Sequence, residues 1–210
     1  SEFGTSNKLT TISGTNALDD ITIGDKAFKG CVGLTTITGL NSVKAVGESS
    51  FEGCSYLTDV SGLSEVTDVG SNAFKGCVRL TNVDGMSSVK TIGTEAFSGC
   101  SKLERIDGFG IGLTEIGDNA FFGCTNLKEV QIFAKTPPVV SANSFPNSST
   151  AKLYVLSRYI DDYAGWGGFT DVSSRNILIE LNNVLQGSIL SNENGNVQSS
   201  TYWAVDFGYD

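Results

Sequence analysis

The chain has 210 residues, a formal net charge of −9 and 18% charged residues, and this acidic balance argues against binding to nucleic-acid phosphates, which requires clustered Lys and Arg. It contains no histidine, which excludes His-based zinc and iron sites and the Ser-His and Cys-His nucleophile pairs, so an enzyme is not expected. No apolar run reaches the roughly 18 residues that a membrane-spanning segment needs.

The first residues look unlike the rest of the chain. The stretch SEFGTSNK lacks the charged region and the apolar core of a signal peptide, and we interpret residues 1–8 as a cloning scar or linker with which a native export signal was removed. Residues 9–21, LTTISGTNALDDI, read as a degenerate first half-coil, because Leu9 and Ile12 match Leu34 and Ile37 of the next copy.

From residue 27 the chain repeats one pattern, in which a Phe and a Cys three residues apart precede a Leu and an Ile or Val. The copies follow one another at spacings of 23, 23, 23 and 24 residues, a period that is typical of a leucine-rich-repeat solenoid. The constant positions are expected to form an inward structural spine: Phe28, Phe51, Phe74, Phe97, Phe121, Cys31, Cys54, Cys77, Cys100 and Cys124.

Each copy divides into short segments that a single coil cannot bury by itself. Segments such as LTTITGL suit short parallel strands stacked at about 4.8 Å per coil, and segments such as VKAVG suit a second strand that ends at a glycine. A short helical or 3₁₀ turn is expected before each Phe. The sequence therefore predicts a solenoid of about 23-residue repeats over residues 9–156, as a curved or right-handed coil with degenerate first and last repeats.

The five cysteines occur once per coil, which favours buried, free side chains at a tight corner. An odd number cannot pair fully, and the close cysteine clusters of a zinc site are absent. Oxidation between neighbouring coils stays open, because stacked coils bring cysteines close to one another.

The side chains that flank the inward Ile or Val are expected to point outward and to form a ladder from coil to coil. Three interpretations remain open for this ladder: a solvated sheet face, a protein-binding surface, and a Ca²⁺ site built on Asp84 and Asp107. Paired carboxylates of a glycoside hydrolase are a remoter interpretation, because a solenoid face offers no obvious cleft. The candidate partner-binding residues are Asp59, Asn82, Asp84, Arg105, Asp107, Glu129 and Gln131.

Three aromatic residues at variable positions, Tyr56, Phe109 and Phe122, are candidate exposed anchors for a partner. Residues 157–175 contain Tyr159, Tyr163, Trp166 and Phe169, and they are interpreted as a capping segment that closes the stack. Residues 176–210 depart from the repeat and are expected to form a β-rich tail, since alternating apolar runs flank the turn sequence NENGN.

The motif IGxxAFxGCxxLxxI, together with the terminal TPPVV...SFPNSSTAKLYV stretch, resembles the BspA-like leucine-rich repeats of bacterial surface proteins over roughly residues 9–172. The resemblance implies an exported or surface-attached protein whose repeats present a binding face, with adhesion as the usual role. One departure concerns the residues after the first strand, where the family commonly has IP. This chain has Gly followed by an apolar residue, at Gly39, Gly62, Gly85 and Gly108.

Together these features predict a non-enzymatic, secreted or surface-exposed bacterial binding module that adheres to a host matrix or cell-surface protein through the exposed strand face. No cofactor, resident metal, nucleic acid or membrane-spanning segment is expected. Two alternatives remain: a structural spacer that self-associates through the C-terminal tail, and, more remotely, a polysaccharide-acting protein.

Overall fold

The structure is a computed structural model that describes residues 8–13, 21–141, 143–146 and 149–174. Contacts divide the chain into Ser1–Ser174 and Arg175–Asp210, and the predicted C-terminal tail lies outside the described residues. Most of the predicted N-terminal scar, residues 1–7, also lies outside them. None of the described helices has the length and apolar character that crossing a bilayer requires.

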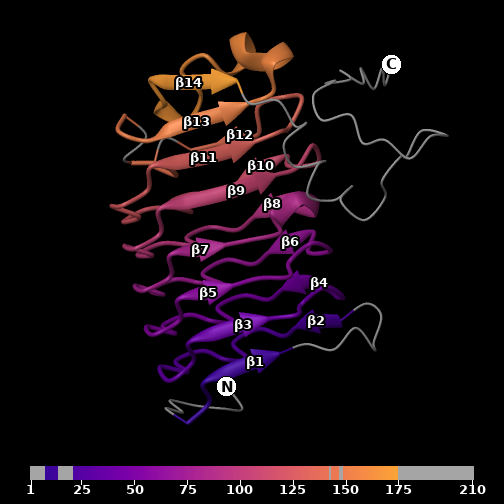
Figure 1. Cartoon of the computed structure of the whole chain (residues 1–210), viewed down its shortest axis with the longest axis vertical. Coiled ribbons are helices and arrows are strands. Elements are labelled where there is room, and N and C mark those ends of the chain that lie inside the picture. Colours follow the sequence, from indigo (N-terminus) through magenta and orange to yellow (C-terminus); the bar gives the residue numbers. More distant parts are fainter. Residues whose placement is uncertain (1–7, 14–20, 142, 147–148, 175–210) are drawn as a thin grey trace, which may run out of the picture. The chain divides into compact units, whose positions relative to one another are not determined.

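The described strands form two columns of parallel strands, and each turn of the chain contributes one strand to each column over most of its length (Figure 1). The predicted solenoid of roughly 23-residue turns is therefore confirmed. The first column has two sheets: β1 (Thr11–Ser13), β3 (Thr36–Thr38), β5 (Asp59–Val60) and β7 (Asn82–Val83), then β9 (Arg105–Phe109), β11 (Glu129–Ile132), β13 (Lys152–Val155) and β14 (Asp171–Ser174). The second is one sheet: β2 (Ile21–Ile23), β4 (Val43–Val46), β6 (Asp68–Val69), β8 (Thr91–Ile92), β10 (Glu115–Ile116) and β12 (Val139–Val140). Among the described residues, three 3₁₀ helices complete the elements: η1 (Met86–Ser88), η2 (Ser157–Tyr163) and η3 (Trp166–Gly168).

Alternation along the short strands places the core between the two columns. In β3 the central Ile37 is fully buried while Thr36 and Thr38 are partly exposed. Ile37 lies opposite Val60, and Val60 opposite Val83, so the inward residues of neighbouring coils stack on one another. This register buries a continuous apolar core that no single coil could enclose.

The corner that carries Ala-Phe is a run of turns in the described coils, not the helical or 3₁₀ turn that the sequence predicted. Hydrogen bonds from residue i to residue i−3 do occur, as from Cys31 N to Phe28 O at 3.1 Å, but alternate amides donate to the next coil, as from Phe28 N to Ser50 O at 2.8 Å. A residue with positive φ interrupts each turn and prevents a helix. These residues are Lys26, Ser49, Asn72, Glu95 and Asn119.

The corner phenylalanines stack face to face along the solenoid. Successive rings from Phe28 to Phe121 lie 5.2–5.3 Å apart, and Phe145 continues the stack 4.8 Å from Phe121. Beyond it, Trp166 and Phe169 pack against Phe145, at 5.7 and 5.2 Å. These two aromatic side chains cover the last ring of the stack.

The five cysteines are all free thiols and all buried, as the spacing predicted. Each one from Cys54 onward donates a hydrogen bond from its Sγ to the Phe carbonyl of the preceding coil, as Cys77 does to Phe51 at 3.2 Å. Burial raises the pKa of Cys54 and of Cys124 to about 12. The thiols therefore stay protonated and fill the corner as small, weakly polar side chains.

This burial predicts a pH dependence that a Cys124→Ala variant isolates. A cysteine of the unfolded chain has a pKa near 8.5, so between that pH and about 12 the unfolded state binds fewer protons than the folded state and stability falls as pH rises. The loss of unfolding free energy between about pH 8 and about pH 10 is expected to be about 2 kcal/mol smaller in Cys124→Ala than in the wild type. Urea titrations under reducing conditions measure both values, and an unchanged pH dependence would contradict the burial of this thiol.

The departure from the family pattern at Gly39, Gly62, Gly85 and Gly108 has a backbone reason. All four have positive φ, between 70° and 86°, a conformation in which a β-branched residue such as the family's Ile is a steric outlier. At Gly62 a Cβ would also lie 2.7 Å from the backbone nitrogen of Leu40. In these four coils the chain therefore bends through a left-handed glycine at or just after the first strand.

One coil departs from the regular stack. The extra residue of the 24-residue copy falls between Phe109 and Leu113, and here Gly110 packs directly on Ser87 of η1. In the same region β7 and β9 are not paired, and a 3.4 Å hydrogen bond from Glu104 N to Thr81 O joins their coils. The first column is therefore interrupted between β7 and β9.

Candidate functional site

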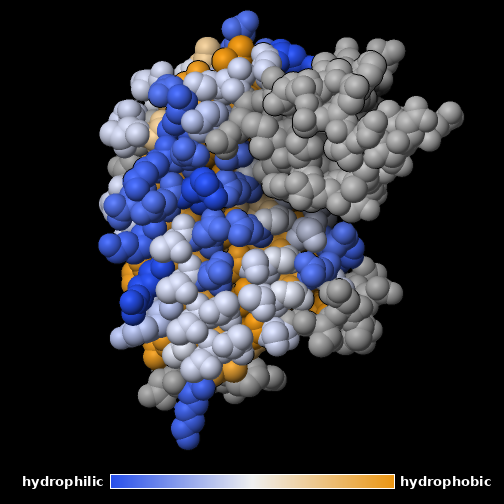
Figure 2. Space-filling model, in the orientation of Figure 1, coloured by the Kyte–Doolittle hydropathy of each residue, from blue (hydrophilic) through white to orange (hydrophobic). Residues whose placement is uncertain are grey.

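The first column presents an outward ladder whose chemistry changes along the solenoid. Near the N-terminal end the outward residues are Thr36 and Thr38 of β3, whereas Arg105 and Asp107 of β9 are charged. Figure 2 shows this change, since pale side chains cover the region of β3 and β5 and blue, hydrophilic ones gather over β7 to β11. The backbone ladder fixes the spacing of these side chains, so the face is a rigid display of variable groups.

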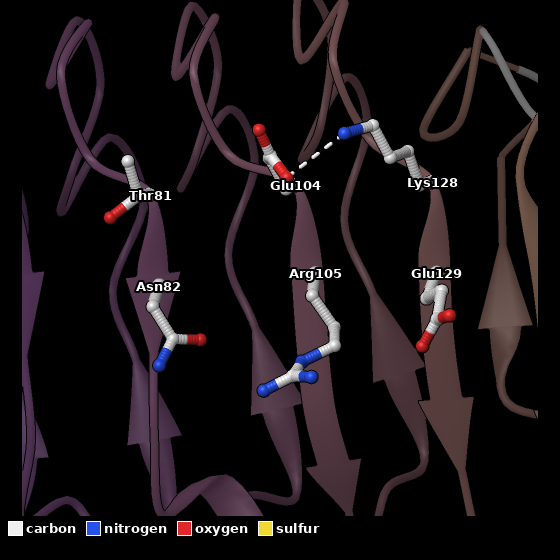
Figure 3. Close-up of a pocket in the computed structure, with 6 residues that line it drawn as sticks. All are labelled: Thr81, Asn82, Glu104, Arg105, Lys128 and Glu129. Carbon is white, nitrogen blue, oxygen red and sulfur yellow. Dashed lines mark hydrogen bonds and ion pairs between the residues drawn. The ribbon is translucent and has the colours of Figure 1, made fainter.

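A shallow depression of about 410 Å³ lies on this face, across the interruption between β7 and β9. Two residues from each of three successive coils line it, one just before the strand and one at its start (Figure 3). The lining residues are Thr81, Asn82, Glu104, Arg105, Lys128 and Glu129.

Ion pairs hold the charged side chains of this site. Lys128 Nζ lies 2.9 Å from Glu104 Oε2, and both side chains are more than half exposed (Figure 3). Arg105 Nη2 lies 2.7 Å from Asp107 Oδ2 within the same strand. Exposed pairs of this kind contribute at most about 1 kcal/mol each, so they orient the groups without making them unavailable to a partner.

The structure brings together part of the predicted set. Asn82, Arg105 and Glu129 line the depression, while Asp59 is exposed one coil before Asn82, with which it is paired in register. Asp84 accepts a hydrogen bond from Asn82 Nδ2 at 2.8 Å. These five residues occupy one continuous stretch of the face.

Two predicted residues are corrected. Gln131 is only 4% exposed and donates from Nε2 to Asp107 Oδ1 at 3.0 Å, so it supports Asp107 and does not face a partner. Phe109 is fully buried and its ring lies 6.5 Å from that of Phe121, so it is not an anchor. Phe109 follows Gly108 as Leu40 follows Gly39, and this aligned position is apolar and inward in every copy.

The other two aromatic candidates are exposed but do not meet. Tyr56 is 53% exposed and Phe122 is 54% exposed. Tyr56 follows Cys54 whereas Phe122 precedes Cys124, so they lie on different parts of the corner and three coils apart. They form no common aromatic patch.

The Ca²⁺ interpretation finds no support in the donor set. Asp84 and Asp107 are already engaged by Asn82, Arg105 and Gln131. Within the described part of the chain, no three His, Cys, Asp or Glu side chains are grouped closely enough to hold a metal ion.

Three lining residues, Thr81, Glu104 and Lys128, were not predicted. They stand one position before the outward strand residue, where Thr35 and Thr58 occupy the earlier coils. The change from Thr to Glu and Lys at this aligned position was a usable signal, because a position free to vary between copies faces away from the core.

Comparison with known proteins identifies the repeats. The family model described as BspA type leucine rich repeat region matches residues 21–152 in six copies. Comparison with curated proteins finds no match.

Solved structures share the fold. A leucine-rich repeat protein of T. pallidum is 21% identical, with a TM-score of 0.59 over 85% of this chain and 84% of its own. A leucine-rich cell surface protein from Faecalibacterium prausnitzii is 20% identical, with a TM-score of 0.45 over 84% of this chain and 54% of its own. The first likeness supports the architecture and, at this identity, nothing about a partner.

Proposed function

The chain belongs to the BspA-type leucine-rich repeat family, and on that premise we propose that it is a non-catalytic bacterial binding module, secreted or held at the cell surface, that adheres to a host matrix or cell-surface protein. Proteins of this family and fold are typically scaffolds for protein interaction. The observation that carries the proposal is the depression between β7 and β11, where polar side chains of one coil and charged side chains of the next two lie together on a rigid face.

The charges of this face favour a basic partner surface. The predicted residues of the face carry four negative charges and one positive charge, from Asp59, Asp84, Asp107, Glu129 and Arg105. The whole chain has a net charge of −9. Complementary charge accelerates encounter and fixes the register of a complex more than it adds affinity. Binding is therefore expected to weaken as salt concentration rises.

The alternatives receive less support. Glu104 and Glu129 are the carboxylates of the depression, but Glu104 is paired with Lys128 on an open surface, which fits glycoside hydrolysis poorly. Self-association through the tail depends on residues 176–210, which lie outside the described residues.

A matched pair of triple variants tests the proposed face. Asp59→Ser/Arg105→Ser/Glu129→Ser removes two negative charges and one positive charge from it, and is expected to weaken binding at least about tenfold, because hot-spot contacts concentrate in such a patch. Interferometry against immobilised extracellular matrix proteins measures the affinity of the purified chain.

The control is Asp118→Ser/Lys90→Ser/Glu115→Ser, which makes the same change of charge at exposed positions in and around β8 and β10. It is expected to bind as the wild type does. Equal binding by both variants would refute the assignment of the site, and failure of the wild type to bind any matrix protein would refute adhesion to host matrix.

A further inference from the structure

A second exposed surface lies at the turn that follows each cysteine. We define the post-cysteine corner as Val32, Tyr56, Val78, Arg79 and Lys102, each one or two residues after its Cys. Six large hydrophobic residues are exposed in the described part of the chain, and half of them, Val32, Tyr56 and Val78, belong to this corner. Singly exposed apolar residues need no explanation, but these three occupy the same turn in three consecutive coils.

Hydrogen bonds and a cation–π contact show that these turns stack directly on one another. Ser101, the residue after Cys100, donates from Oγ to the carbonyl of Val78, the residue after Cys77, at 3.3 Å. One position further on, the Arg79 guanidinium carbon lies 5.0 Å from the centre of the Tyr56 ring. The corner therefore combines an exposed aromatic ring with a guanidinium held over its face.

The cations of the corner differ from two nearby lysines in their ion pairing. Lys29 is paired with Glu52 at 2.8 Å and Lys75 with Glu95 at 2.6 Å on the preceding turn of the same coils. Among the described residues, neither Arg79 nor Lys102 has a carboxylate within 4.0 Å. On a chain of net charge −9, the corner therefore places two cations that have no ion pair among the described residues beside exposed apolar side chains.

We propose that the post-cysteine corner binds an acidic segment of a partner protein. An apolar side chain of that segment packs on Val32, Tyr56 and Val78, and its carboxylates pair with Arg79 and Lys102. Arg and Tyr are the residue types that dominate binding energy at protein interfaces, and Arg pairs with a carboxylate in two-point geometry. The corner borders the depression, since Arg79 and Lys102 stand two residues before Thr81 and Glu104, but it uses other side chains. It also selects a partner of opposite charge, so the inference does not depend on the function proposed for the strand face.

The test uses a fluorescent random copolymer of Glu and Tyr as the probe, titrated with the full chain and followed by anisotropy. The Arg79→Gln/Lys102→Gln variant is expected to bind about tenfold more weakly than the wild type, because both charge contacts are lost. Tyr56→Ser keeps both cations and is expected to bind about threefold more weakly or worse, because the apolar contact is lost.

The control is Lys90→Gln/Lys135→Gln, which removes the same charge from exposed positions elsewhere and is expected to bind within about twofold of the wild type. Absence of wild-type binding, or an equal loss in this control, overturns the proposal. Equal affinity for heparin also overturns it, because the corner would then recognise any polyanion. Sedimentation tests whether a second copy of the chain is the occupant instead. If the wild type self-associates and Arg79→Gln/Lys102→Gln abolishes that association, the proposal is overturned.

Discussion

The Phe121→Ala variant is expected to lose about 3–5 kcal/mol of unfolding free energy, the range measured for large-to-small changes in packed cores. The Phe121 ring is 1% exposed and is stacked between Phe97 at 5.3 Å and Phe145 at 4.8 Å. Each coil of a solenoid contacts only its neighbours, so the cavity falls at one joint of the stack and other contacts cannot compensate for it. Urea unfolding followed by circular dichroism measures the change.

The adjacent residue supplies the matched control. Phe122 is the same residue type, one position further along, but 54% exposed, so Phe122→Ala is expected to change the unfolding free energy by no more than about 0.5 kcal/mol. Similar losses in the two variants would contradict the inward stack. A lower slope of the unfolding transition in Phe121→Ala would show that the stack divides into two parts that unfold separately.

The architecture was predictable because a solenoid repeats one packing problem. Phe28 and its four copies had to bury against the next coil, and the spacing alone predicted their stack and the burial of the cysteines. The structural role of Gly39 and its equivalents was not predictable. A glycine is equally suited to a left-handed backbone bend and to a close approach between the backbones of two coils. Gly93 shows the second use, because its φ is not positive but a Cβ would lie 2.4 Å from Ser71 N.

The site was predicted less completely than the fold. Outward positions such as Asn82 and Arg105 follow from strand alternation, but the depression is formed by three coils together, beside the interruption between β7 and β9. In the same coils Gly110 packs on η1, and the extra residue of the 24-residue copy lies in this segment, so the regular repeat alone does not give the local packing. The exposure of Gln131 was mispredicted because alternation gives only the side of the strand, whereas its low exposure and its hydrogen bond to Asp107 depend on packing against the neighbouring coils.

The contact between Gly110 and η1 predicts a second large loss of stability. A Cβ at Gly110 would lie 1.8 Å from Ser87 O and 2.8 Å from Ser87 C, and both atoms belong to backbone that cannot rotate away. Gly110→Ala is therefore expected to lower the unfolding free energy by about 3 kcal/mol, at the upper end of the cost of overpacking, because a whole coil must shift.

Gly112 is the control, two residues along the same segment. Its Cβ would meet only Lys90 Cγ at 3.8 Å and its φ is not positive, so Gly112→Ala is expected to leave stability unchanged within about 0.5 kcal/mol or to raise it slightly by reducing the entropy of the unfolded chain. Thermal and urea unfolding of both variants measure the difference. If Gly110→Ala were as stable as Gly112→Ala, the segment would not close over η1, and the packing beside the interrupted strands would need a different explanation.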